Sequence, residues 1–334
     1  MPSLLRHWLL LAFLPVALAT ASSHAQVTEA AAVPPQQAAD KAAFAEVDRA
    51  LAEGFEDVQA MVVLQRGRVV YEFHRNGQAD EPLMVASVTK SMLSTLVGIA
   101  LGQGRIASLD QPVLALVPEW AGLNADPRAG AVTLRHLLTM TSGFEPMMRE
   151  TTAREAWARP LRAAPGQSFA YDNAMVPLLV AILEKATGSP VADYARRELA
   201  QPLGAGPFEP RRGLRMRTVD MARVGQLYLQ KGRWDGRQIV PESYVAAATR
   251  PQNAGGPPVF LAYGLAWWVV PSSKGDRQTY MAAGFGGQLI WVNEPSDLVV
   301  AVHSTVSLAS GLRGQAMELI RGPVFAAARK RAAP

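Results

Sequence analysis

The sequence predicts an α+β fold in which a mainly antiparallel β-sheet is flanked by helices and carries an inserted all-α lobe. Strand-like runs occur near both ends of the 334-residue chain, whereas helical patterns and long turns fill its middle. These strands form one sheet only if the early pair joins the late ones, an arrangement typical of α+β proteins. We expect terminal helices to cover one face of the sheet, and the helix that follows Ser87 to cover the other.

The strand predictions rest on β-rich runs that are bounded by turn residues. Val58–Gln65 and Arg68–Arg75 are joined by Arg66-Gly67. A two-residue loop that ends in glycine is typical of a hairpin. The late strands are expected at Tyr263–Val270, Gln278–Ala283, Gln288–Val292 and Leu298–Ser304.

The helix predictions follow from apolar residues at helical spacing, with capping residues before them and glycine or proline after them. Asp40 and Thr218 are expected to cap helices, and Pro323 to bend the last one. Val176, Leu179, Val180 and Leu183 are expected on one face of a central helix. Besides the Ser87 helix, the longest helices are predicted over residues 40–52, 174–187, 219–230 and 312–328.

The N-terminal residues have the pattern of a secretory signal. Arg6 precedes a short apolar run from Trp8 to Ala19, and Ser23 and Ala25 place small residues where a signal peptidase reads them. We therefore expect residues 1–25 to be removed and residues 26–39, rich in Ala, Pro and Gln, to form a disordered leader. An uncleaved N-terminal anchor is the alternative. A signal-bearing chain without cysteine fits a secreted protein of the bacterial periplasm.

The mature chain is predicted to be one domain over residues 40–330, made of two lobes. An α/β lobe is expected from about 40–104 and 215–330, and a helical lobe from about 105–214, with the site between them. No membrane span is expected after signal cleavage. The net charge of +5 includes a cluster of Arg149, Arg154, Arg159 and Arg162. Because no nucleic-acid module accompanies it, we interpret this cluster as solvated surface and expect no nucleic-acid partner.

Ser87 and Lys90 are the candidate nucleophile and base. They stand three residues apart at the start of a helix that is apolar nearly all round, so their side chains share one face. A serine hydroxyl becomes a good nucleophile only when a base takes its proton. Burial and the positive helix end both favour the neutral lysine that this requires. The backbone N–H of Ser87 is also placed to bind an oxyanion. The alternative is that Ser87 merely caps the helix.

Tyr171 and Asn173 are the next candidates. Two residues apart in extended or loop backbone, their side chains can point the same way. A tyrosine beside a lysine ammonium loses its proton more easily and can relay a proton to a leaving group. Asn173 can bind a substrate carbonyl or hold Lys90. The alternative is that Asp172 or Asn173 caps the following helix and Tyr171 is a core residue.

Taken in order, these motifs resemble the serine β-lactamase and penicillin-binding-protein superfamily. The pattern is Ser87-x-x-Lys90, then Tyr171-x-Asn173, then a late strand ending in a glycine-rich turn. It is most similar to the branch of class C β-lactamases, esterases and nylon-oligomer (6-aminohexanoate-dimer) hydrolases. The resemblance implies a β-lactamase/transpeptidase-like fold and a serine hydrolase that forms an acyl-enzyme. It also implies that Lys90 and Tyr171 share the acid and base roles, in an order left open.

The third motif departs from that family. Its Lys-Thr-Gly, or His-Thr-Gly, corresponds here to Ala282-Ala283-Gly284, followed by Phe285 and Gly286. The resemblance implies that the Phe285 N–H completes the oxyanion hole, and that Gly284 and Gly286 let substrate approach the strand edge. We expect position 282 to face the cleft. The missing cation and hydroxyl would otherwise hold a substrate carboxylate, so a neutral ester or amide is the expected substrate.

Other catalytic schemes find less support. The sequence has no G-x-S-x-G elbow and no H-E-x-x-H motif, and His74, His136 and His303 are widely separated. We expect no metal and no cofactor. Two alternatives to a neutral-substrate hydrolase stay open: a β-lactamase or D-alanyl-D-alanine carboxypeptidase that finds its cation elsewhere, and a non-catalytic peptidoglycan-binding relative.

Overall fold

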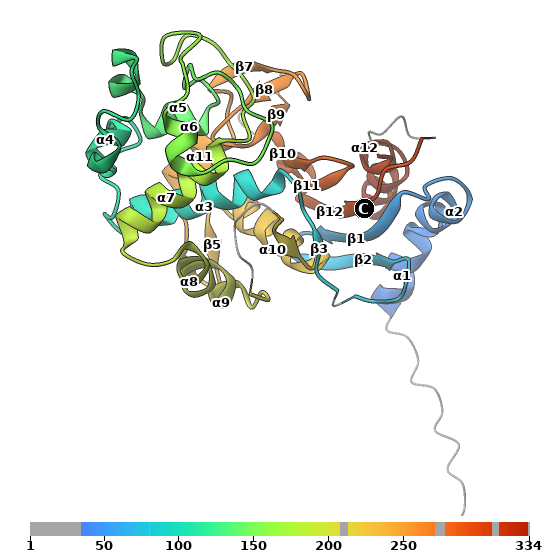
Figure 1. Ribbon diagram of the computed structural model, residues 1–334. Helices are drawn as coiled ribbons and strands as arrows, with labels where there is room; N and C mark the ends of the chain where they lie inside the picture. Colours follow the sequence, from blue (N-terminus) through green and yellow to red (C-terminus); the bar gives the residue numbers. More distant parts are fainter. Residues whose placement is uncertain (1–34, 80, 208–212, 271–277, 309–313, 333–334) are drawn as a thin grey trace, which may run out of the picture.

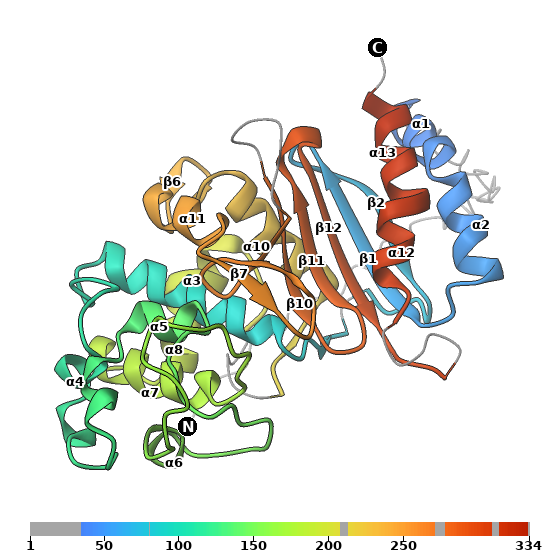
Figure 2. The same ribbon diagram turned by 90° about the horizontal axis from the view of Figure 1, so that it is seen from above.

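A computed structural model describes residues 35–79, 81–207, 213–270, 278–308 and 314–332. The predicted signal peptide and residues 26–34 of the predicted leader lie outside these ranges. The structure confirms the α+β fold, with one large antiparallel sheet and helices on both of its faces (Figures 1 and 2).

Eight strands form the sheet, in the order β2-β1-β12-β11-β10-β9-β8-β7. Their bounds are β1 Val58–Gln65, β2 Arg68–His74, β7 Asn253–Gly256, β8 Leu261–Tyr263, β9 Trp268–Val270, β10 Thr279–Gly284, β11 Gln288–Asn293 and β12 Leu298–Ser304. The early hairpin joins the late strands as expected, because β1 pairs antiparallel with β12. Arg66 and Gly67, which connect β1 and β2, both have positive φ, as a tight hairpin turn requires. Two-stranded pairs are formed by β3 Leu83–Met84 with β4 Arg215–Met216, and by β5 Arg233–Trp234 with β6 Arg237–Gln238.

Helices from the two ends of the chain cover one face of the sheet (Figure 2). They are α1 Pro35–Ala43, α2 Ala45–Glu53, α12 Ala316–Leu319 and α13 Phe325–Ala332. Residues 35–39, predicted as leader, belong to α1, so Asp40 lies inside a helix and caps none. Asp40 is buried and accepts hydrogen bonds from Gln36 and Arg331, which tie the two ends of the chain together. Pro323 lies in a π-helical segment between α12 and α13, and the bend expected there stays a prediction.

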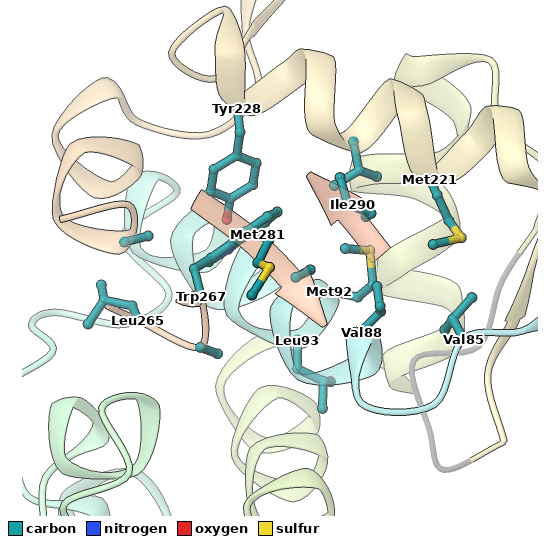
Figure 3. Packing of buried hydrophobic residues seen from close by; sticks show 14 of the residues in the cluster. Val85, Val88, Met92, Leu93, Met221, Tyr228, Leu265, Trp267, Met281 and Ile290 are labelled. Carbon is teal, nitrogen blue, oxygen red and sulfur yellow. The ribbon is translucent and has the colours of Figure 1, made fainter. Parts of the chain in front are cut away.

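Two helices cover the opposite face, α3 Val88–Gly102 and α10 Thr218–Leu229 (Figure 2). Every residue of α3 from Val88 to Ala100 is buried, as its all-round apolar pattern predicts. Figure 3 shows the core between α3, α10 and the sheet, to which Met92, Tyr228 and Trp267 belong. The rings of Tyr228 and Trp267 have centroids 4.4 Å apart.

Buried hydroxyls tie α3 to a tight turn and correct one strand prediction. Ser91 Oγ donates to the carbonyl of Ala266 at 2.6 Å, and Ser94 Oγ to that of Leu265 at 2.7 Å. Ala266 has φ +61°, a left-handed conformation that interrupts a strand. Residues 263–270, predicted as one strand, therefore form the end of β8, a turn and β9.

The remaining helices gather beside α3 and away from the sheet (Figure 2). They are α4 Val113–Leu116, α5 Leu134–Leu138, α6 Ala153–Trp157, α7 Met175–Thr187, α8 Val191–Ala195 and α9 Gln201–Leu203, and α11 Glu242–Ala248 follows α10. Among the described residues, no single helix combines the length and apolarity needed to cross a bilayer. Only the pair Met175–Thr187 and Val191–Leu203, bent by 76°, meets both criteria when its halves are added.

Thr218 was expected to cap α10 but is the first residue of that helix. Its hydroxyl bonds to a buried histidine. Its Oγ1 lies 2.9 Å from Nδ1 of His303 on β12. His303 is 1% exposed, and burial lowers its pKa to about 4. A neutral, buried imidazole that is hydrogen-bonded to a hydroxyl has a structural role. This agrees with the sequence interpretation of His303 as a sheet residue rather than a base.

This histidine predicts a loss of stability in acid. Its folded pKa lies below the unfolded value of 6.5, so its contribution is complete above pH 6.5 and is lost as pH falls towards 4. Across that window we expect the free energy of unfolding to fall by about 3 kcal/mol on its account. Urea titrations of wild type and His303→Gln between pH 4 and 7 measure this. An equal pH dependence in the two proteins would contradict it.

Candidate active site

The nucleophile candidate stands at a sharp turn between β3 and α3. Ala86 has φ +48°, in the left-handed region that is costly for a residue with a side chain. Ser87 follows with φ −72° and ψ −3°, and its side chain makes no capping hydrogen bond. The capping alternative for Ser87 is therefore wrong. Its hydroxyl is instead directed to other partners.

Lys90 lies one helical turn further and is 3% exposed. Its Nζ donates to Ser87 Oγ at 3.0 Å and to Asn173 Oδ1 at 2.8 Å. The same Nζ lies 4.7 Å from the centroid of the Tyr171 ring, within the range of a cation–π contact. The structure thus brings all four candidates from two distant motifs into one cluster, in which the amine is in reach of the serine proton.

The pKa of Tyr171 is shifted in the direction opposite to the expected one. Burial raises the pKa of its hydroxyl to about 12, although a hydrogen bond with Ser87 opposes the shift. The expectation that a neighbouring lysine eases proton loss is therefore wrong, because removal from water outweighs it. Tyr171 is a neutral hydrogen-bond donor near pH 7. Its ring stacks on Trp268 of β9, with centroids 5.8 Å apart.

A buried ion pair fixes the Tyr171–Asn173 segment. Arg159 Nη1 and Nη2 donate to the two carboxylate oxygens of Asp172 at 3.1 and 2.8 Å, and both side chains are less than a tenth exposed. Asp172 Oδ1 also accepts from the backbone N–H groups of Met147 and Ala174. Asp172 thus binds the backbone just before α7, whose N-cap is Ala174 and has no side-chain cap, so the capping alternative is wrong. Asn173 faces Lys90.

Arg159 corrects the interpretation of the arginine cluster as solvated surface. Besides Asp172, its guanidinium donates to the carbonyls of Glu145 and Ala156, each at 2.7 Å. Sequence reasoning missed this residue because a partner 13 positions away, across a loop, leaves no periodic signal. The neighbouring Arg162 is exposed and pairs with Glu145 on the surface.

The glycine-rich turn after β10 packs against the nucleophile's loop. A Cβ on Gly284 would lie 2.4 Å from the carbonyl oxygen of Val85, so only glycine allows β10 this close. Gly286 has φ +81°, which the turn requires. Among the described residues, neither glycine lines the cavity beside Ser87, whereas Phe285 lines it and is 70% exposed. A substrate contact from either glycine stays a prediction.

Position 282 does not face the cleft as expected. Ala282 is fully buried on β10, opposite Ile290 of β11, and is not among the residues that line the cavity. Ala283, the position of the missing hydroxyl, is half-buried. Strand alternation places one of two consecutive residues in the packed interior, and here that residue is Ala282.

A cavity of about 720 Å³ opens beside this cluster. The described residues that line this cavity include Ser87, Lys90, Asn173, Phe285 and Arg149. Ser87 lies at this surface, so a carbonyl in the cavity is in reach of its hydroxyl. Among the described residues, no group of three or more His, Cys, Asp or Glu side chains is placed to hold a metal ion.

Comparisons with known proteins agree with this geometry. Residues 47–206, which contain Ser87, Lys90 and Tyr171, match the family model described as Beta-lactamase. The esterase EstB of Burkholderia gladioli is 30% identical over 43% of this chain, and the match spans 44% of that esterase. The 6-aminohexanoate-dimer hydrolase of Paenarthrobacter ureafaciens is 27% identical over 74% of this chain and 72% of its own. A penicillin-binding-protein homologue from Caulobacter crescentus superposes with a TM-score of 0.68 at 18% identity, covering 88% of this chain and 98% of that one.

The Arg159–Asp172 pair predicts a large stability effect at a site distant from the sheet core. Asp172→Asn leaves the buried guanidinium without its counter-charge, which costs about 3–5 kcal/mol of unfolding free energy. Arg162→Ala, the matched exposed pair, should cost no more than about 1 kcal/mol. Urea unfolding of both variants checks this. Equal losses in the two would show that burial does not set the strength of the pair.

Proposed function

From the confirmed resemblance of this chain to the β-lactamase family, we propose that the protein is a serine hydrolase that forms an acyl-enzyme at Ser87. The observation that carries the proposal is the contact between the buried Lys90 Nζ and Ser87 Oγ at 3.0 Å, at the wall of the cavity. A base at that distance can accept the hydroxyl proton as the oxygen attacks. The bond that breaks is the ester or amide bond of a substrate held in the adjoining cavity.

The roles divide between Lys90 and Tyr171 according to their surroundings. Lys90, in its neutral form, takes the proton of Ser87, and Ser87 Oγ attacks the substrate carbonyl. The backbone N–H groups of Ser87 and Phe285 bind the oxyanion. Tyr171, whose pKa of about 12 keeps it protonated, donates its proton to the leaving group and regains one from the Lys90 ammonium. Water then cleaves the acyl-enzyme by the reverse route.

The substrate that we propose is a small neutral ester or amide. Support comes from β10, where the half-buried Ala283 stands in place of the family's hydroxyl and the buried Ala282 offers no cation to the cavity. Hydrogen bonds to charged groups are worth more than apolar contacts of similar size, so their loss disfavours carboxylate-bearing substrates. The name of one relative, an esterase, agrees with this choice.

A second candidate function rests on Arg149. This residue lines the cavity, and its Nη1 donates to the carbonyl of Glu150. An arginine can take the place of the missing cation and hold a carboxylate. A β-lactamase or D-alanyl-D-alanine carboxypeptidase is the function that this arrangement favours.

A fluorophosphonate probe together with a substrate panel tests these assignments. Wild type should be labelled and should hydrolyse neutral p-nitrophenyl esters, whereas Ser87→Ala should lose labelling and at least about a thousandfold of kcat/KM. Ser91→Ala, which removes a buried hydroxyl of the same helix, is the matched control and should still be labelled.

The panel also contains nitrocefin and a peptide ending in D-Ala-D-Ala. Preferred turnover of these two substrates, lost in Arg149→Ala, would favour the second candidate over the first. A folded wild type that neither takes the label nor turns over any substrate would support the non-catalytic alternative.

We also propose that the enzyme is exported and acts in the bacterial periplasm, on the signal pattern of residues 1–25. Full-length expression in a Gram-negative host should give a periplasmic protein that begins at Gln26, as intact mass measures. Ala25→Arg replaces the small residue at the cleavage site and should leave the chain uncleaved. A cytosolic wild type that retains residues 1–25 would refute export.

A further inference from the structure

The cavity beside Ser87 extends along one face of α7. The α7 residues that line it recur at intervals of three and four, which places them in one row on the helix. They are Val176, Pro177, Val180, Ala181 and Glu184. The row starts one turn after Asn173, which binds Lys90, and therefore leads directly away from the nucleophile.

This extension, here called the α7 groove, has an apolar row on its α7 side, while Arg149, Glu150 and Thr151 also line the cavity. Of the four residues expected on one face of this helix, Leu179 and Leu183 fill the core, while Val176 and Val180 are half-buried against it. Met84, 54% exposed, and Phe285 are further apolar residues that line the same cavity. Large apolar side chains left exposed around a concave site mark it as a place for an apolar ligand.

The length of the groove sets the size of that ligand. Eight residues separate Val176 from Glu184, which is about 12 Å along a helix. An extended alkyl chain advances about 1.25 Å per carbon for bonds of about 1.5 Å, so eight to ten carbons span this distance. The Glu184 carboxylate ends the apolar row and accepts a hydrogen bond from the Val191 N–H. A chain that reached it would meet a charged group.

The position of Tyr171 decides which part of the substrate lies in the groove. Tyr171 is not one of the described residues that line the cavity. Its ring stacks on that of Trp268 in the sheet. The leaving group must lie at the hydroxyl that protonates it. The acyl side of the scissile carbonyl then points the other way, into the α7 groove.

We propose that the α7 groove binds the acyl chain of the substrate and selects linear apolar chains of about eight to ten carbons. This inference rests on the proposed function and names the substrate class of the same site: neutral medium-chain acyl esters or amides. Each methylene buried in the groove raises kcat/KM by up to about fourfold, until the chain reaches Glu184.

Tryptophan substitutions at two positions along the groove test whether it selects the length of the acyl chain. In wild type, kcat/KM for p-nitrophenyl esters should rise from acetate to octanoate or decanoate. Val180→Trp should lower the decanoate-to-acetate ratio of kcat/KM at least tenfold and move the optimum to butyrate or hexanoate. Val176→Trp lies about 6 Å nearer Ser87 and should move the optimum down to acetate or butyrate.

Val69→Trp is the matched control, because Val69 is an exposed valine on β2 that does not line the cavity. Its chain-length profile should equal that of wild type. Cooperative thermal unfolding and fluorophosphonate labelling of Ser87 report that each variant is folded and reactive.

Three results would overturn the inference. Ser87-dependent hydrolysis with the same profile in wild type and both groove variants would show that the groove does not bind the chain. If the groove variants instead changed kcat/KM across a series of alkyl acetates, in which only the alcohol varies, the groove would bind the leaving group. Absence of Ser87-dependent hydrolysis for every ester would refute the proposed function itself, and the inference with it.

Discussion

The burial of α3 on all sides is the constraint on which the candidate site depends. Its apolar residues fill the space between the sheet, α10 and the helical lobe, and its hydroxyls bond to the carbonyls of Leu265 and Ala266. A helix packed at interior density cannot shift without opening voids. Its first turn is therefore held where the edge of β10 meets the helical lobe. Ser87 gains its position from this packing, and the left-handed Ala86 gives the chain the turn that it needs to enter the helix.

The second fixed element is the segment that brings Tyr171 and Asn173 to Lys90. Burying a lysine amine is costly unless polar groups surround it, and Ser87 Oγ and Asn173 Oδ1 are such groups. Both are neutral, and a neutral partner holds the ammonium less strongly than a carboxylate does. The one carboxylate of the Tyr171–Asn173 segment, Asp172, is neutralised by Arg159 on the far side of the loop. The charged pair thus holds the segment that brings Asn173 to Lys90.

The specificity that we propose for this site depends on the shape of the α7 groove and on its apolar residues. The strand edge that faces substrate in the family carries alanine and glycine here, and Gly284 serves to bring β10 against Val85. Apolar recognition discriminates weakly per methylene but accumulates along a chain. An elongated apolar groove next to a reactive serine therefore suits a substrate whose length, rather than one polar contact, decides how well it is bound.

The sequence by itself determined the fold class, the hairpin, the buried helix and the short motifs, because each has a local period or a local turn signal. Ser87 and Lys90 lie one turn apart in any helix, so their pairing required no tertiary information. Tertiary structure alone decided the rest. It moved the pKa of Tyr171 upwards, placed Ala282 in the interior and split residues 263–270 into two strands. It also turned Arg159 inward to Asp172, and left Val176 and Val180 half-buried at the edge of the core, where they line a groove. These outcomes depend on burial, and burial is set by neighbours that are distant in sequence, whose identity no local pattern contains.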